Sequence, residues 1–159
     1  MTSGPSDGRD PGSFRDPSGF VFWRDGLPHR RIEPRFAASW DAFAASPFAA
    51  QLIKRGLVVP WELAPAISPH DDGAHAIIRA ERIEFISYPY EWTFGQLRDA
   101  ALLTLDIQSL AITHGFTLRD ASAYNIQFRR GRPIHIDTLS FEPVEPDRPW
   151  PAYRQFCEH

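Results

Sequence analysis

Three polar side chains in the last third of the sequence have the types and the spacing that phosphate chemistry requires. Asp120 is followed five residues later by Asn125, and Asp137 ends the apolar segment 134–137 after a turn at Gly131. In phosphoryl transfer, one carboxylate orients the attacking hydroxyl, while an amide and a second carboxylate hold magnesium on the nucleotide phosphates. We therefore predict Asp120 as the catalytic base, and Asn125 and Asp137 as ligands of a magnesium–nucleotide complex.

The same three residues also have a purely structural interpretation. Asp and Asn are common turn residues because their side chains bond to nearby backbone groups. Asp120 would then cap a turn, Asn125 would lie in a loop, and Asp137 would cap the segment that begins at Thr138. Because two such common residues often fall at this spacing by chance, the spacing alone leaves both interpretations open.

The elements that must position these residues fall into three regions. Residues 1–18 are rich in Gly, Ser, Pro and Asp, which predicts a disordered leader. Residues 19–92 carry strand patterns, with two short helices at about 36–55, and form a strand-rich small lobe. Residues 93–159 begin with a long helix and continue through the Asp120 loop and a hairpin. This order predicts an α+β, protein-kinase-like fold: a small lobe followed by the start of a helical large lobe, truncated at its C-terminus.

Short local signals support these elements. Asp25-Gly26 is a hairpin turn signal, and Ser46-Pro47 gives a helix cap followed by a proline at the first helical position. Thr93 and Gln96 form a capping-box pair at the start of the long helix. Its wide apolar stripe predicts a largely buried helix. The stripe consists of Leu97, Ala101, Leu105 and Ile112, widened by Leu103, Ile107 and Leu110.

The sequence departs from working kinases at several positions. Leu118 precedes Arg119 where a His is usual, and Ser122 stands where kinases carry Lys or His. Thr138-Leu139 replaces the Phe-Gly pair that normally follows the metal-binding Asp. These changes favour a kinase-like architecture without phosphotransfer.

The phosphate-contacting lysine of a kinase strand is also missing. The only lysine, Lys54, falls in a predicted helix, and no glycine-rich loop precedes it. Arg30 or Arg31 would have to substitute, so we predict both as cofactor-binding residues, although Arg replaces Lys poorly in geometry.

Composition limits the classes of partner. A net charge of −3 and a pI near 6.0 argue against a nucleic-acid surface. A single cysteine excludes an internal disulfide, and the sequence contains neither a signal peptide nor a run long enough to span a membrane. We expect a cytoplasmic protein without nucleic-acid or membrane partners.

An aromatic segment precedes the long helix. Tyr88, Tyr90 and Trp92, interrupted by Pro89, could form an aromatic binding wall. Packing in the core and at the hinge between the lobes is the favoured interpretation.

Four blocks of sequence resemble one family, the N-terminal region of bacterial nodulation-protein-related class I SAM-dependent methyltransferases. The resemblance covers about residues 19–159 and implies that the full protein continues into further helices and a methyltransferase domain. The blocks are Ser87-Tyr88-Pro89-Tyr90-Glu91-Trp92, Asp120-Ala121-Ser122-Ala123-Tyr124-Asn125, Ile136-Asp137-Thr138-Leu139-Ser140-Phe141-Glu142 and Tyr153-Arg154-Gln155-Phe156-Cys157.

The resemblance implies that SAM binds only in the missing C-terminal domain, which would be a partner of this region. The glycines here never form a Gly-x-Gly, the signal of a nucleotide-type cofactor turn. We predict an N-terminal kinase-like module that recognises an unknown small-molecule substrate or a nucleotide. The alternatives are an active small-molecule phosphotransferase with Asp120 as base, and a non-catalytic interaction module in which the polar residues only stabilise loops.

Overall fold

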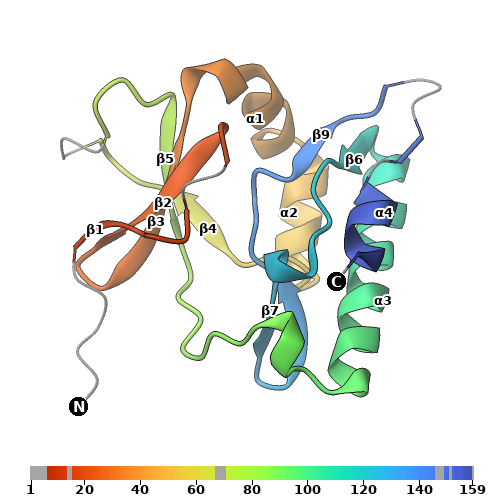
Figure 1. Ribbon diagram of the computed structural model, residues 1–159. Coiled ribbons are helices and arrows are strands. Elements are labelled where there is room, and N and C mark those ends of the chain that lie inside the picture. Colours follow the sequence, from red (N-terminus) through yellow and green to blue (C-terminus); the bar gives the residue numbers. More distant parts are fainter. Residues whose placement is uncertain (1–6, 14–15, 67–70, 146–148, 151, 159) are drawn as a thin grey trace, which may run out of the picture. The chain divides into compact units, whose positions relative to one another are not determined.

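The computed structural model describes residues 7–13, 16–66, 71–145, 149–150 and 152–158 (Figure 1). The chain divides into two compact units. We call Met1–Trp40 with Pro60–Arg82 the sheet unit, and Asp41–Val59 with Ile83–His159 the site unit. Each unit is described separately.

The sheet unit contains a five-stranded antiparallel sheet in the order β1-β2-β3-β5-β4. Asp25 and Gly26 connect β2 to β3, and both have positive φ angles, 52° and 69°. Such a two-residue turn matches the right-handed twist of paired strands, which confirms the predicted hairpin. The strands are β1 Gly8–Arg9, β2 Gly19–Arg24, β3 Leu27–Ile32, β4 Trp61–Leu63 and β5 Ala76–Ala80.

Strand β1 lies within residues 1–18, where the composition predicts a disordered leader. Gly8 pairs with Trp23, and the indole nitrogen of Trp23 donates to Asp10 Oδ2 at 2.8 Å. The described residues 7–13 and 16–18 therefore correct that expectation, because polar leader residues pair with the sheet. Residues 1–6 and 14–15 of the leader lie outside the described part of the chain.

The core of the sheet unit combines apolar packing with a buried ion pair. Phe22 and Ile32 are fully buried. The guanidinium of Arg24 donates to both carboxylate oxygens of Asp71, at 2.8 and 2.7 Å, and the Asp71 side chain is only 2% exposed. Both bonds start from Nη2 of Arg24, and these charge-assisted bonds offset part of the cost of removing both charges from water.

Three helices form as the local signals predict. The hydroxyl of Ser46 accepts a bond from Ala49 N at 3.2 Å at the start of α2, and Gly56 with φ 68° follows that helix. Gln96 N donates to Thr93 Oγ1 and Thr93 N donates to Gln96 Oε1, which completes the capping box. The helices are α1 Ala37–Ala44, after the short η1 Pro34–Phe36, then α2 Pro47–Lys54 and α3 Phe94–Thr113.

The burial of α3 differs from the sequence expectation. Leu103 and Ile107 are buried, whereas Leu105 is 50% exposed and Ile112 is 57% exposed. The prediction of a largely buried helix with Leu105 and Ile112 in its stripe is therefore wrong. Apolar residues occur around most of this helix, so periodicity alone could not identify the side that other elements cover.

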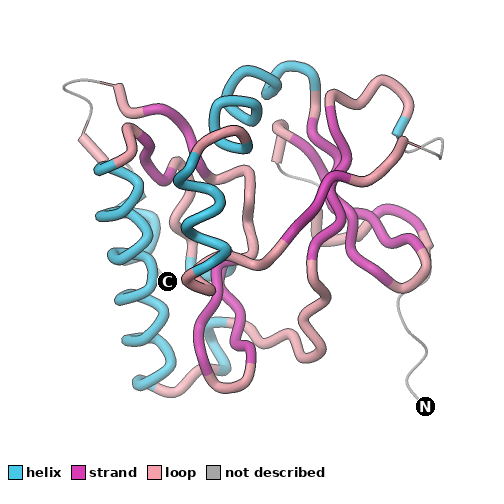
Figure 2. The backbone as a smooth tube through the Cα atoms, turned by 180° about the vertical axis from the view of Figure 1, so that it is seen from behind, coloured by secondary structure: helices cyan, strands magenta, loops and turns pink. Residues whose placement is uncertain are grey.

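The site unit also contains two short antiparallel sheets, β6 with β9 and β7 with β8 (Figure 2). The β7–β8 turn has positive φ at Arg130 and Gly131, which confirms the predicted hairpin. The remaining elements are η3 Pro89–Glu91, β6 Phe116–Leu118, η4 Ala123–Asn125, β7 Ile126–Arg129, β8 Arg132–His135, β9 Phe141–Pro143 and α4 Ala152–Cys157.

A cluster of four phenylalanines packs this unit. The rings of Phe43 and Phe141 stack with centroids 4.6 Å apart, and those of Phe48 and Phe116 stack at 5.5 Å. These contacts join the first helices of the chain to β6 and β9, the strands that flank the predicted site. Within the described residues, no helix is both long enough and apolar enough to cross a membrane.

Candidate functional site

The loop after β6 carries Asp120, and hydrogen bonds hold it on both sides. Arg119 N donates to Ser140 O at 2.7 Å, and Ala121 N donates to Gln155 Oε1 on α4 at 3.1 Å. Asp120 Oδ1 accepts from Ser122 N at 2.9 Å. Asp120 is therefore fixed at a turn between two short elements, and it is half-buried.

Asn125 ends the short helix η4, and its main chain lies beside the residue that precedes Asp137. Asn125 O accepts from Ile136 N at 2.8 Å. The side-chain nitrogen Nδ2 is buried and has no hydrogen-bond partner among the described residues. An unpartnered buried donor costs about 1–3 kcal/mol, so an acceptor at this position would stabilise the loop.

Asp137 is buried, and both carboxylate oxygens bond within its own loop. Oδ1 accepts from Leu139 N at 3.0 Å, and Oδ2 accepts from Ser140 Oγ at 2.6 Å. These bonds offset the cost of burying the charge.

The structure thus places the three predicted residues on connected loops of one unit. The Arg119–Ser140 bond joins the Asp120 loop to the Asp137 loop, and the Asn125–Ile136 bond joins Asn125 to that same loop. The structural alternative, in which Asp120 and Asp137 cap turns, predicts the same bonds, in which each carboxylate accepts from the backbone N–H two residues on. Magnesium binding and catalysis stay predictions.

Asn125 and Asp137 would supply one amide oxygen and one carboxylate to a cation. In the part of the chain that the structure describes, no group of three or more His, Cys, Asp or Glu side chains could hold a metal ion. Magnesium usually keeps several waters and takes one or two protein carboxylates plus substrate phosphates. The donor set therefore suits magnesium carried by a phosphate ligand better than a structural metal site.

Arg30 and Arg31 lie on β3 in the sheet unit, where each forms an ion pair. Arg30 contacts Asp16 at 2.9 Å and Arg31 contacts Glu33 at 2.9 Å. Arg31 also donates to the backbone oxygen of Asp72 at 2.6 Å. Their cofactor-binding role stays a prediction. The contacts that the structure shows for both arginines lie within the sheet unit and stabilise it.

Sequence reasoning missed two residues that shape the site. Ser140 is fully buried and donates to Asp137, and Gln155 reaches the Asp120 loop from α4. The spacing Asp137-x-x-Ser140 is a local signal that could have identified the first contact, since side chains three residues apart meet readily in turns. The contact from Gln155 crosses 34 residues and has no local signal.

The chain is similar to a known nodulation protein. It is 38% identical over 166 residues to the nodulation protein NoeA of Rhizobium meliloti strain 1021. The match covers 99% of the chain and 33% of the relative, so the chain spans about a third of the length of this curated relative. No protein-family profile matches the chain. The nodulation-related part of the resemblance is therefore confirmed, and the methyltransferase class stays a prediction.

Proposed function

We propose that the chain is a kinase-like recognition module of a nodulation-related protein, and that its site unit binds a phosphate ligand through magnesium without transferring the phosphoryl group. The element order supports this assignment: an antiparallel sheet, a long helix, the Asp120 loop, the β7–β8 hairpin and then Asp137. A kinase site requires its catalytic loop and its metal-binding Asp in that order.

One observation carries the proposal. The 2.8 Å bond between Asn125 O and Ile136 N joins the backbone of the predicted amide ligand to the residue before the predicted carboxylate ligand. The unpartnered Nδ2 of Asn125 is buried, so it could donate to a phosphate oxygen only after the side chain turns outward.

The local chemistry favours binding over transfer. Asp120 already caps the turn at Ser122, and Ser122 stands where kinases carry a cationic or imidazole side chain. Leu139, fully buried, replaces the glycine of the metal-binding loop. Phosphotransfer with Asp120 as base is the alternative, which release of ADP in the presence of a sugar or amine acceptor would establish.

The wider protein is part of the same proposal. We infer a longer cytoplasmic protein in which this module presents a small-molecule substrate to a C-terminal methyltransferase domain that binds SAM. Support comes from the sequence resemblance and from the one-third coverage of the nodulation protein. Sequencing the gene downstream of His159 tests this point: a SAM-binding glycine motif supports it, and a stop codon contradicts it.

The decisive binding test uses the whole chain with Mg-ATP. We expect isothermal titration calorimetry to show binding that depends on magnesium, and Asp137→Asn to weaken it about tenfold or more because a carboxylate ligand is lost. Asp106→Asn, which removes the same charge from an exposed position on α3, should leave binding unchanged.

Two results would contradict the proposal. Equal affinity of the wild type and Asp137→Asn would show that Asp137 is not a ligand. Absence of binding by the wild type would favour the alternative of a non-catalytic interaction module, in which Asp120 and Asp137 only stabilise their loops.

A further inference from the structure

Three tyrosines of the site unit lie on the surface in ring contact with one another. The rings of Tyr88 and Tyr90 are nearly parallel, at 7°, with centroids 5.5 Å apart, and Tyr124 lies 6.4 Å from Tyr88. Tyr90 is 75% exposed, and the other two are nearly half exposed. The expected packing in the core therefore applies to Trp92, which contacts Phe128, but not to these residues. We call Tyr88, Tyr90 and Tyr124 the tyrosine platform.

The backbone under the platform is held firmly. The side-chain amide of Gln127 accepts from Ser87 N at 2.9 Å and donates to Ser87 O at 3.0 Å, and both residues are buried. Trp92 Nε1 donates to Ser87 Oγ at 2.9 Å. Tyr88 N donates to Glu91 Oε2 at 2.8 Å. A surface that is ordered before binding loses little entropy when a ligand arrives.

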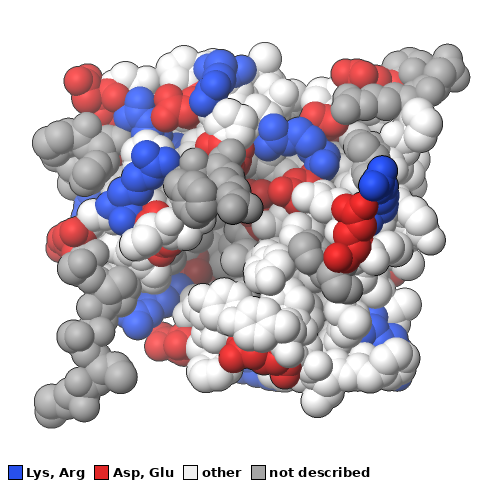
Figure 3. Space-filling model, viewed as in Figure 1, with Lys and Arg blue, Asp and Glu red and all other residues white. Residues whose placement is uncertain are grey.

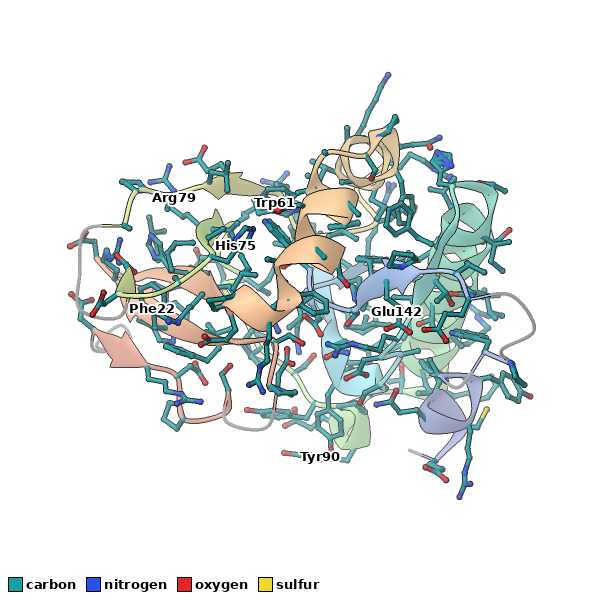
Figure 4. All side chains as sticks on the ribbon, turned by 90° about the horizontal axis from the view of Figure 1, so that it is seen from above. Phe22, Trp61, His75, Arg79, Tyr90 and Glu142 are labelled. Carbon is teal, nitrogen blue, oxygen red and sulfur yellow. The ribbon has the colours of Figure 1, made fainter. Side chains whose placement is uncertain are left out.

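The charge in direct contact with the platform is the carboxylate of Glu91, which accepts from Tyr88 N at 2.8 Å. Residues 83–98 and 119–129 carry three acidic residues and three arginines: Glu84, Glu91, Asp120, Arg98, Arg119 and Arg129. Figure 3, seen from the same side as Figure 1, shows a broad uncharged area with both acidic and basic side chains at its lower border. Figure 4 shows Tyr90 projecting from η3. The negative charge of Glu91 disfavours an anionic ligand on the adjacent rings and favours a neutral one.

The size of the platform favours a small ring over a protein surface. Three partly exposed tyrosines offer roughly a few hundred Å² of ring surface, because each tyrosine buries at most about 250 Å². A stable protein interface buries more than about 1,000 Å². In addition, a sugar presents weakly positive C–H groups on its faces and hydroxyls at its edges. The C–H groups of the sugar can pack against the negative faces of the tyrosine rings. The sugar hydroxyls can form hydrogen bonds with phenol and carboxylate oxygens.

We propose that the tyrosine platform binds a neutral sugar ring, stacked on the exposed ring of Tyr90, which is itself stacked on Tyr88, with Tyr124 in contact with Tyr88. Tyr124 directly precedes Asn125, so the bound sugar would lie beside the predicted magnesium site. Its role as the small-molecule substrate rests on the proposed function, whereas binding to the platform does not involve magnesium or nucleotide.

The test is an NMR titration of the full 159-residue chain with cellohexaose and maltohexaose, without magnesium. We expect one of them to bind, and Tyr90→Ala to weaken binding about tenfold or more, which is the loss that removing an aromatic side chain causes for a stacked nucleobase. Tyr90→Phe keeps the ring and should retain most of the affinity. Tyr153→Ala, an exposed tyrosine outside the platform, should change nothing.

The outcomes separate this inference from the proposed function. Asp137→Asn should bind the sugar like the wild type, so failure of the magnesium site leaves the platform intact. Absence of binding by both hexasaccharides, or equal binding by the Tyr90→Ala/Tyr124→Ala double variant, would overturn the inference. Self-association of the wild type that Tyr90→Ala abolishes would assign the platform to a contact between copies of the chain, and would also overturn it.

Discussion

The two units use polar side chains in different ways. In the sheet unit, charged side chains bind one another, as in Arg24–Asp71 and Arg30–Asp16. In the site unit, Asp120 and Asp137 instead accept bonds from backbone N–H groups and a serine within their own loops. The carboxylates thus differ in the kind of partner: those of the sheet unit neutralise an arginine, whereas those of the site unit hold backbone N–H groups of their own loops. The comparison makes the ion pairs of the sheet unit a test of stability, while binding by the site unit stays a proposal.

The largest effect should come from breaking the buried ion pair of the sheet unit. Asp71→Ala leaves the charge of Arg24 buried without its main partner, so the free energy of unfolding should fall by about 3–5 kcal/mol. Urea denaturation followed by tryptophan fluorescence measures this loss. Glu62→Ala breaks the exposed pair with Arg79 and should cost at most about 1 kcal/mol. Equal losses of unfolding free energy in the two variants would show that the buried pair contributes no more to stability than the exposed pair.

A smaller effect should follow from breaking the backbone support of the site unit. Gln127→Ala removes both bonds to Ser87 and leaves a buried N–H and C=O without partners, which should cost about 1–3 kcal/mol. Hydrogen exchange at Ser87 should accelerate in this variant while exchange in β2 and β3 stays unchanged. Faster hydrogen exchange in β2 and β3 as well would show that the two units do not unfold independently.

The smallest effect concerns pH and is confined to the sheet unit. Burial, followed by the nearby charges of Arg24 and Arg79, holds the pKa of His29 below its ordinary value of 6.5, although a bond to Leu27 O opposes this shift. The folded state therefore binds the proton less readily than the unfolded state. The stability that neutral His29 contributes is complete above pH 6.5 and is lost as the pH falls toward the folded-state pKa.

Thermal unfolding between about pH 8 and pH 5 measures this dependence, because His29 changes charge in that range. His29→Phe keeps the stacking on Phe22 and should flatten the acid side of the profile. An unchanged profile in the variant would assign the acid sensitivity to another group.

Local sequence signals located most of the elements but not their burial. Asp25-Gly26, Ser46-Pro47 and the Thr93–Gln96 pair each specify backbone geometry within a few residues, and the structure has the expected turn, cap and helix start at each. Leu105 and the tyrosine platform are exposed because no distant element packs over them among the described residues, and no local sequence pattern encodes which residues are covered.

The sequence by itself determined the β2–β3 and β7–β8 hairpins, the helices α1 to α3, and the spacing of Asp120, Asn125 and Asp137. Short-range sterics and hydrogen bonding set these features. Only the tertiary structure decided that backbone bonds connect the three residues, that Ser140 and Gln155 support them, and that three tyrosines from two segments form one surface. These contacts join residues far apart along the chain, and they arise only when packing brings distant segments together.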